Sequence, residues 1–255
     1  MKISRFLKQT TIDYPEKIAS MVFTSGCNLR CPACYSKQTI EGKSEIFENE
    51  VFDYINKINS WKKFIDGIVI CGGEPTIHSD LPNFCRKAKG LELDVKLDTN
   101  GTNPGRLATL RDEKLVDYVA MDVKGPVRLY PQIIGLGEGK WDLRDNLGKG
   151  IGIVAGFPEH EYRTTMVPIY KNGKPRWMTE VEVKGIAKLI YEWTGSKEHA
   201  FYLQPFLAMN KEEMMDERFT KDKLPKEFWE TPVELMQKYK KALLPLLPQT
   251  KIRGE

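Results

Sequence analysis

The sequence lacks any apolar run approaching the roughly 20 residues that a helix needs to cross a bilayer. Its first residues, Met-Lys-Ile-Ser-Arg, lack the apolar core of a signal peptide. These two absences predict a cytoplasmic protein with no membrane partner. An excess of one charge is also absent, because 39 basic and 35 acidic residues are spread along the chain and leave a net charge of +4. Composition therefore does not indicate a nucleic-acid-binding surface.

Histidine and cysteine are scarce, with three and five copies in 255 residues, but the cysteines are clustered. Cys27, Cys31 and Cys34 follow the spacing C-x3-C-x2-C. An odd number of cysteines with so tight a cluster does not fit a disulfide framework in a cytosolic chain. A metal centre is the leading interpretation. A structural zinc site would require a fourth ligand, and His78 is the only histidine in the first half of the chain.

A chain with 41% hydrophobic and 29% charged residues has the composition of an ordinary folded protein. Its length allows it to bury the core of an enzyme in one domain. We therefore expect a single domain over residues 1–255, with a barrel core at about 15–207 and a C-terminal part at 208–255. Within that part, residues 209–230 are charge-rich and contain Pro225, which predicts a loop or lid.

Short runs of β-branched residues alternate with amphipathic helical patterns along most of the chain. Six successive units of this kind indicate a parallel sheet with right-handed crossovers. The chain is short for a closed eight-stranded barrel, so we predict an α/β fold with a partial (β/α)6 TIM-like barrel. The expected strands are residues 18–24, 67–71, 94–98, 117–123, 162–167 and 201–206. The expected helices lie near residues 50–61, 80–89, 104–111, 142–154 and 179–193, the fourth weakened by three glycines.

The end of the chain carries the signal of a last helix. Thr231 stands in the position of an N-cap, Pro232 in the first helical position, and Glu234 in the position of a capping-box partner. Outside the cluster, cysteine and histidine have simpler expected roles. We expect Cys71 and Cys85 in the core, and His160 and His199 at the surface.

The cysteine cluster directly follows the first expected strand, and loops after strands carry the sites of parallel α/β folds. Three thiolates bind three irons of a cubane cluster, whereas full ligation by protein needs four. The open iron can chelate the amino and carboxylate groups of a methionine moiety and hold its sulfonium for one-electron cleavage. We therefore predict that Cys27, Cys31 and Cys34 hold a [4Fe-4S] cluster that binds S-adenosylmethionine.

Three later strands end in short polar segments that would lie on the same rim as the cysteine loop. Glycines let the backbone approach a ligand, and a carboxylate can bind an ammonium group. Turn and cap chemistry is the simpler interpretation. Against it, a buried Asp and Lys two residues apart are costly unless they pair or meet a ligand. The segments are Gly72-Gly73-Glu74-Pro75, Leu97-Asp98-Thr99-Asn100-Gly101 and Met121-Asp122-Val123-Lys124.

The cysteine loop resembles the signature of the radical S-adenosylmethionine superfamily, which places it after the first strand of a partial (β/α)6 barrel. The order of all the motifs is similar to that in activating enzymes of glycyl radical proteins, above all the anaerobic ribonucleoside-triphosphate reductase activating proteins. Two positions depart from the pattern, since Ala33 replaces an aromatic residue and Glu16 a glycine. Further marks of the resemblance are Ile12-Asp13-Tyr14-Pro15, Arg163-Thr164-Thr165 and Ile252-Arg253-Gly254.

The resemblance implies a role for each rim segment. The amino group of the methionine moiety would meet the Gly-Gly-Glu segment, and its carboxylate would meet Lys124. Asp98, Thr99 and Asp122 would hold a monovalent cation. Arg163 would bind a carboxylate or ribose oxygens, for which a solvated arginine is the equal alternative. The expected cofactor-binding residues are Tyr35, Gly72, Gly73, Glu74, Asp98, Asn100, Lys124, Arg163 and Gln204.

The function implied by the resemblance begins with an electron from a reduced flavodoxin or ferredoxin. The bound cofactor is then cleaved to a 5′-deoxyadenosyl radical, which takes a hydrogen atom from a glycine of a partner protein. One alternative is a radical enzyme that acts directly on a small molecule or a tRNA base, and the lysine-rich stretch 221–241 would suit RNA. A non-enzymatic metal-binding module is the third hypothesis.

Overall fold

The computed structural model describes residues 1–42, 46–60, 64–136 and 143–255. Within them, eight strands form one curled sheet in the order β1-β2-β3-β4-β5-β6-β9-β10. The pairs from β2 to β10 are parallel, and β1 (Ile3–Thr10) is antiparallel to β2. The expected partial α/β barrel is confirmed. The parallel strands are β2 (Ala19–Thr24), β3 (Gly67–Gly72), β4 (Asp94–Thr99), β5 (Tyr118–Asp122), β6 (Glu159–Met166), β9 (Phe201–Pro205) and β10 (Thr250–Ile252).

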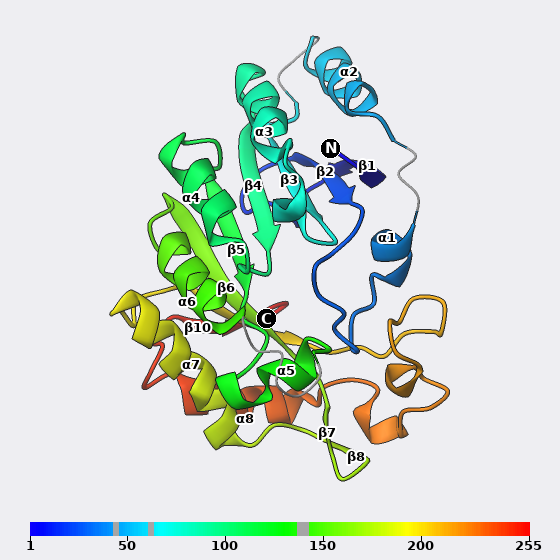
Figure 1. Ribbon diagram of the computed structural model, residues 1–255, viewed down its shortest axis with the longest axis vertical. Helices are drawn as coiled ribbons and strands as arrows, with labels where there is room; N and C mark the ends of the chain where they lie inside the picture. Colours follow the sequence, from blue (N-terminus) through cyan, green and yellow to red (C-terminus); the bar gives the residue numbers. More distant parts are fainter. Residues whose placement is uncertain (43–45, 61–63, 137–142) are drawn as a thin grey trace.

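Helices cover the outer face of the sheet (Figure 1). The expected helices are present within a few residues of their predicted bounds, while two of their predicted positions, Trp61 and Asp142, lie outside the described residues. Helix α7 shows how the sequence sets such bounds, since Thr179 and Glu182 form a capping box and Gly195 ends the helix at φ 68°. The longer helices are α2 (Glu48–Asn59), α3 (Leu81–Gly90), α4 (Pro104–Asp112), α6 (Leu143–Val154), α7 (Glu180–Thr194) and α8 (Val233–Leu243). The short ones are α1 (Lys37–Glu41) and α5 (Tyr130–Ile133).

The glycines of α6 allow close packing against neighbouring parts of the chain. A Cβ atom on Gly148 would overlap the indole of Trp193 on α7, and one on Gly150 would overlap the carbonyl oxygen of Gly101. Gly101 itself, at φ 73°, belongs to the turn after β4. The glycines that weaken α6 as an isolated helix therefore let it approach the site-bearing turn closely.

The two faces of the sheet bury different residues. The larger core lies between the sheet and the helices, and it includes Cys85. A smaller apolar cluster lies on the interior face of the sheet, around Tyr14, Met21 and Cys71. Both isolated cysteines are thus buried, as expected. Because side chains alternate along a strand, Asp122 shares the interior face of β5 with Tyr118 of this apolar cluster.

Several elements were not predicted. Strand β1 and the three-residue strand β10 extend the sheet at its two edges. A hairpin of β7 (Ile169–Lys171) and β8 (Lys174–Arg176) follows β6. Its Asn172-Gly173 turn has positive φ at both residues, the sequence signal of a two-residue hairpin.

The predicted N-cap of the last helix is wrong. Helix α8 begins at Val233 after Pro232, without a side-chain cap. The hydroxyl of Thr231 instead donates to the carbonyl of Met166 and accepts the N–H of Phe206. Thr231 therefore joins the ends of β6 and β9.

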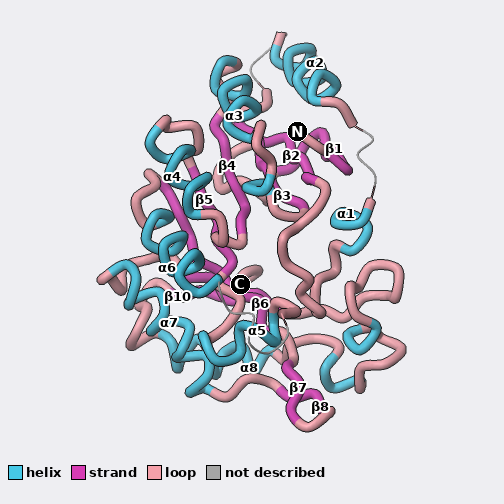
Figure 2. Tube along the Cα trace, viewed as in Figure 1, coloured by secondary structure: helices cyan, strands magenta, loops and turns pink. Residues whose placement is uncertain are grey.

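Residues 209–230 contain only two short 3-10 turns, η3 (Glu217–Phe219) and η4 (Lys226–Phe228), as expected for a loop. Figure 2 shows this segment beside the loop that follows β2. Among the described ranges, no helix combines the length and the apolarity that a membrane crossing needs.

The predicted surface position of His199 is also wrong. The side chain is buried, and its Nδ1 lies 2.9 Å from Nε2 of His160. Tyr162 packs edge-on against both rings. The two histidines therefore form a pair at the start of β6 and just before β9.

This pair predicts a loss of stability in mild acid. Burial lowers the pKa of both His160 and His199, so the folded protein binds fewer protons than the unfolded chain. The stability from the neutral pair should be complete above about pH 6.5 and should fall as the pH drops through the lowered folded pKa values. We expect the free energy of unfolding, measured with urea, to fall less between neutral and acid pH for His199→Asn than for the wild type. Parallel curves would contradict the prediction.

Candidate functional site

The cysteine loop leaves the carboxyl end of β2 and places three half-buried, unbridged thiols at the rim of the barrel. Backbone groups point at two of the sulfurs. The N–H of Leu29 donates to Sγ of Cys27 at 3.4 Å, and that of Ser36 donates to Sγ of Cys34 at 3.5 Å. Such N–H donors stabilise a thiolate, and they are a feature of iron–sulfur sites.

Burial opposes charge on these thiols when no metal is bound. It raises the pKa of Cys31 to about 12, partly countered by the positive charge of Lys124. Burial also raises the pKa of Cys27, although the hydrogen bond from the N–H of Leu29 offsets part of this increase. Thiolates here therefore need a compensating cation, which a metal centre supplies.

The cysteine loop is held from three directions. Asn28 donates to the hydroxyl of Thr102 at 2.7 Å and accepts from the amide of Asn100 at 2.9 Å. The N–H of Arg30 donates to the carbonyl of Ile134 at 3.2 Å. From the 209–230 segment, the N–H of Met215 donates to the carbonyl of Cys34 at 2.9 Å. Distant parts of the chain thus fix the loop, and the sequence patterns revealed none of these anchors.

The Gly-Gly-Glu turn clamps the start of the cysteine loop. The N–H groups of Gly73 and Glu74 donate to the carbonyls of Thr24 and Gly26, each at 2.9 Å. A Cβ atom on Gly72 would overlap Thr24, and one on Gly73 would overlap Gly26. Both glycines are therefore required by backbone packing within the site.

The carboxylate of Glu74 is buried and joins this turn to the end of β4. Its Oε1 accepts from the N–H and hydroxyl of Thr76 and from the hydroxyl of Thr99, at 3.1, 2.6 and 2.7 Å. Its Oε2 accepts the N–H of Asn100 at 2.7 Å. Burial raises the pKa of Glu74, although these donors offset part of the effect. Oε2 accepts one hydrogen bond and therefore keeps a lone pair for one further donor.

Replacing Glu74 with glutamine is predicted to destabilise the protein by about 2 kcal/mol. Both carboxylate oxygens of Glu74 accept hydrogen bonds, so the NH2 group of glutamine would replace an acceptor in either orientation of the amide. The donors facing that NH2 group would lose their partner. Urea unfolding of the metal-free protein measures the change, with Glu41→Gln on exposed α1 as the matched control. Equal stability of the two variants would show that the Glu74 hydrogen bonds are dispensable.

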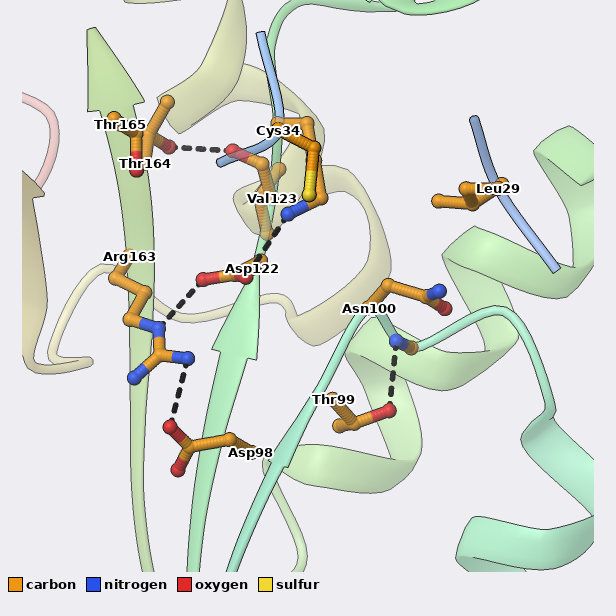
Figure 3. Close-up of polar contacts among 12 residues, drawn as sticks. Leu29, Cys34, Asp98, Thr99, Asn100, Asp122, Val123, Arg163, Thr164 and Thr165 are labelled. Carbon is orange, nitrogen blue, oxygen red and sulfur yellow. Dashed lines mark hydrogen bonds and ion pairs between the residues drawn. The ribbon is translucent and has the colours of Figure 1, made fainter. Parts of the chain in front are cut away.

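Charged side chains of three strands meet in the barrel interior. Figure 3 shows the guanidinium of Arg163 between Asp98 and Asp122. Its Nη2 lies 3.0 Å from Asp98 and its Nε 2.5 Å from Asp122. Lys96 pairs with Asp98 at 2.8 Å, and Lys124 pairs with Asp122 at 2.9 Å.

Lys96, Asp98, Arg163, Asp122 and Lys124 form a ladder of alternating charges. Attraction outweighs burial at both aspartates, at Arg163 and at Lys124. Burial alone would raise the pKa of Asp98 and Asp122, but the neighbouring cations hold both below their usual range. Burial would likewise lower the pKa of Lys124, but Asp122 raises it instead. Asp98, Asp122, Arg163 and Lys124 are therefore charged at neutral pH.

The other expected cofactor-binding residues lie in different surroundings. Asn100 uses its side chain to hold Asn28 and Thr102. The amide oxygen of Gln204 lies 3.4 Å from the hydroxyl of Thr165, on the interior face of the sheet. Tyr35 is 63% exposed as a whole, yet burial of its hydroxyl raises its pKa, and Asp122 and Arg163 lie near enough to influence it. Lys96 was missed, although its position two residues before Asp98 on one strand puts both on the same face.

The residues at the rim fit an iron–sulfur cluster. The site has three thiols, N–H donors to sulfur and a cation beside Cys31. Within the described ranges, no three His, Cys, Asp or Glu side chains converge on a point that could hold a single metal ion. Cysteines of a cubane each bind a different iron, so they need not converge in that way.

A partial parallel barrel with a three-cysteine loop after its first parallel strand defines the class of enzymes that use an iron–sulfur cluster to generate radicals. The family model of the radical SAM superfamily matches residues 21–149. The chain belongs to this superfamily, and it is a radical SAM enzyme whose cofactors are S-adenosylmethionine and a [4Fe-4S] cluster.

Two curated relatives illustrate the range of the family. A protein of Methanocaldococcus jannaschii, provisionally named a glycyl-radical enzyme activating enzyme, is 33% identical over 228 residues, which are 88% of this chain and 87% of the relative. The 7-carboxy-7-deazaguanine synthase of Aquifex aeolicus is 37% identical over 78 residues, which are 30% of this chain and 33% of the relative.

Solved structures agree on the fold. SuiB of Streptococcus suis bound to S-adenosylmethionine aligns with 90% of this chain at a TM-score of 0.62 and 12% identity. The chain spans about half of SuiB, 48% of its length. Coproporphyrinogen III oxidase of Escherichia coli aligns with 91% of this chain at a TM-score of 0.54 and 12% identity, over 54% of its own length.

Proposed function

We propose that this protein is an activating enzyme for a glycyl radical protein, and that anaerobic ribonucleoside-triphosphate reductase is the type of partner it serves. The similarity to the Methanocaldococcus protein carries the proposal, because it extends over nearly the whole of both chains. A second relative in that organism, also provisionally named a glycyl-radical enzyme activating enzyme, is 32% identical over 103 residues.

The proposal assigns the chemistry to the cofactors and the geometry to the chain. When both cofactors are bound, one electron splits S-adenosylmethionine and yields a 5′-deoxyadenosyl radical that takes a hydrogen atom. Cys27, Cys31 and Cys34 hold the cluster. Lys124, beside Cys31, binds the carboxylate of the methionine moiety, and the Gly-Gly-Glu turn binds its ammonium group. The cytoplasmic electron donor is a flavodoxin or ferredoxin.

The structure supports this assignment through the shape of the rim. The cysteine loop, the Gly-Gly-Glu turn and the turn after β4 are joined by hydrogen bonds among Gly26, Glu74 and Asn100. A rim joined in this way holds a ligand in one orientation without rearrangement, which is what control of a radical requires. The remaining expected contacts, through Arg163 and Gln204, face the same interior.

The experiment is an anaerobic incubation of the reconstituted protein with dithionite, S-adenosylmethionine and a candidate glycyl radical protein. We expect 5′-deoxyadenosine together with a glycyl radical signal in electron paramagnetic resonance. The matched control is the same partner with its radical-bearing glycine replaced by alanine. The activating function is refuted if 5′-deoxyadenosine forms but no glycyl radical protein gains the signal.

A radical enzyme for a small molecule or tRNA base is the second candidate. The similarity to the Aquifex synthase favours it, although that match covers less than a third of this chain. Binding of tRNA that weakens steeply with salt, combined with deoxyadenosine formation that depends on the nucleic acid, would support this candidate over the first.

A further inference from the structure

The ladder from Lys96 to Lys124 leaves little for an added cation to bind. Oδ1 of Asp98 meets Lys96 and its Oδ2 meets Arg163. Oδ1 of Asp122 meets Arg163 and its Oδ2 meets Lys124. Each of the four carboxylate oxygens thus has a cationic partner from the protein itself.

The third expected ligand of a monovalent cation is also engaged. The hydroxyl of Thr99 donates to Glu74 at 2.7 Å and accepts the N–H of Gly101 at 3.1 Å. Figure 3 shows Thr99 turned away from the gap between Asp98 and Asp122, in which Arg163 lies. The residues that the resemblance assigns to a monovalent cation therefore do not fit one in this protein.

Charge counting leads to the same result. Lys96, Arg163 and Lys124 bring three positive charges, and the two aspartates bring two negative charges, so the ladder has a net charge of +1. The exposed fraction of the three cationic side chains is 6% for Lys96, 14% for Arg163 and 26% for Lys124. Once Lys124 meets the cofactor carboxylate, the charges of the ladder balance. A metal cation beside the buried Lys96 and Arg163 would then add an uncompensated charge, at a high cost.

We propose that Lys96 and Arg163 replace the monovalent cation, so that S-adenosylmethionine binds independently of K⁺ and Na⁺. The guanidinium holds the two aspartates at a fixed separation. The aspartate on β5 in turn fixes Lys124, the group proposed to bind the cofactor carboxylate. Lys96 and Arg163 are thus positioning residues. This inference rests on the proposed cofactor-binding role of the rim and not on the identity of the hydrogen donor.

The test measures equilibrium binding of S-adenosylmethionine to the cluster-loaded protein without any partner protein. Binding is compared in KCl, NaCl and choline chloride at about 0.15 M, because choline cannot enter an oxygen-lined site. For the wild type, we expect dissociation constants within about twofold in the three salts. Wild-type binding that is about tenfold weaker in choline chloride would overturn the inference.

Lys96→Met is the informative variant, because it frees Oδ1 of Asp98 and lowers the ladder to zero net charge. We expect this variant to bind the cofactor about tenfold more weakly in choline chloride than in KCl or NaCl, whichever ion fits the vacated place. Thermal unfolding of the cluster-free variant should show the same preference for a salt. A variant that behaves as the wild type does in every salt, or that no salt restores, would overturn the role of Lys96.

Lys89→Met is the matched control. Lys89 on α3 pairs with Asp117 at 2.8 Å, a half-exposed pair outside the ladder. Its removal should create no dependence on K⁺ or Na⁺. Because no glycyl radical protein enters these measurements, failure of the activating function would leave their outcome unchanged, and failure here would leave that function untouched.

Discussion

Replacing Cys31 with alanine is expected to lower S-adenosylmethionine cleavage by at least about a thousandfold. Burial raises the pKa of this thiol to about 12 in the metal-free protein, so its thiolate depends on the metal centre. Without its thiolate, a cubane would keep two protein ligands in a rim shaped for three. Iron content, visible absorbance and 5′-deoxyadenosine formation after anaerobic reconstitution measure the effect.

Cys85→Ala is the matched control for this change. Cys85 belongs to α3 and is fully buried, and it is far along the chain from the cysteine loop. Its replacement should cost about 1 kcal/mol of stability and leave the iron content unchanged. If Cys31→Ala keeps a full cluster, or if Cys85→Ala loses it, the cysteine loop is not the cluster site.

Gly73→Ala is expected to lower cluster binding about tenfold or more without removing any cysteine. The new methyl group would occupy the space of the Gly26 carbonyl, and backbone rather than a flexible side chain would have to move. Overpacking of this kind costs about 1–3 kcal/mol, and here the displaced backbone carries Cys27. Iron titration of the cluster-free protein measures the affinity.

The control for this variant is Gly105→Ala in the first turn of α4, where a Cβ atom meets nothing within 4 Å. In a helix, this change should stabilise the protein by up to about 1 kcal/mol and leave iron affinity unaltered. Equal iron affinity of both variants would mean that the Gly-Gly-Glu turn does not set the position of the cysteine loop.

The parallel units were predictable because each combines a short β-branched run with a helical period, and both signals are local. Strand β1 was missed since it alternates polar and apolar residues weakly and lies antiparallel at an edge. Strand β10 is only three residues long and depends on pairing with β9. The hairpin after β6 was also missed, although its Asn172-Gly173 turn is a sequence signal for one.

The site could be predicted as a set of strand ends but not as a network. The position of Asp98, Asp122 and Arg163 at the ends or on the face of neighbouring strands followed from the topology of a parallel sheet. Their pairing depends on how three strands curve around one interior, which no local pattern encodes. The same holds for Asn28, whose partners lie beyond β4.

The hydrogen bond from Met215 to Cys34 has a consequence for the order in which the protein matures. A second bond, from the N–H of Lys37 to the carbonyl of Glu213 at 3.2 Å, ties the 209–230 segment to the start of α1. While the chain is being synthesised, the three cysteines emerge long before these anchors exist. An iron–sulfur cluster delivered during translation would meet a loop without its final shape. Cluster insertion should therefore follow release of nearly the whole chain from the ribosome.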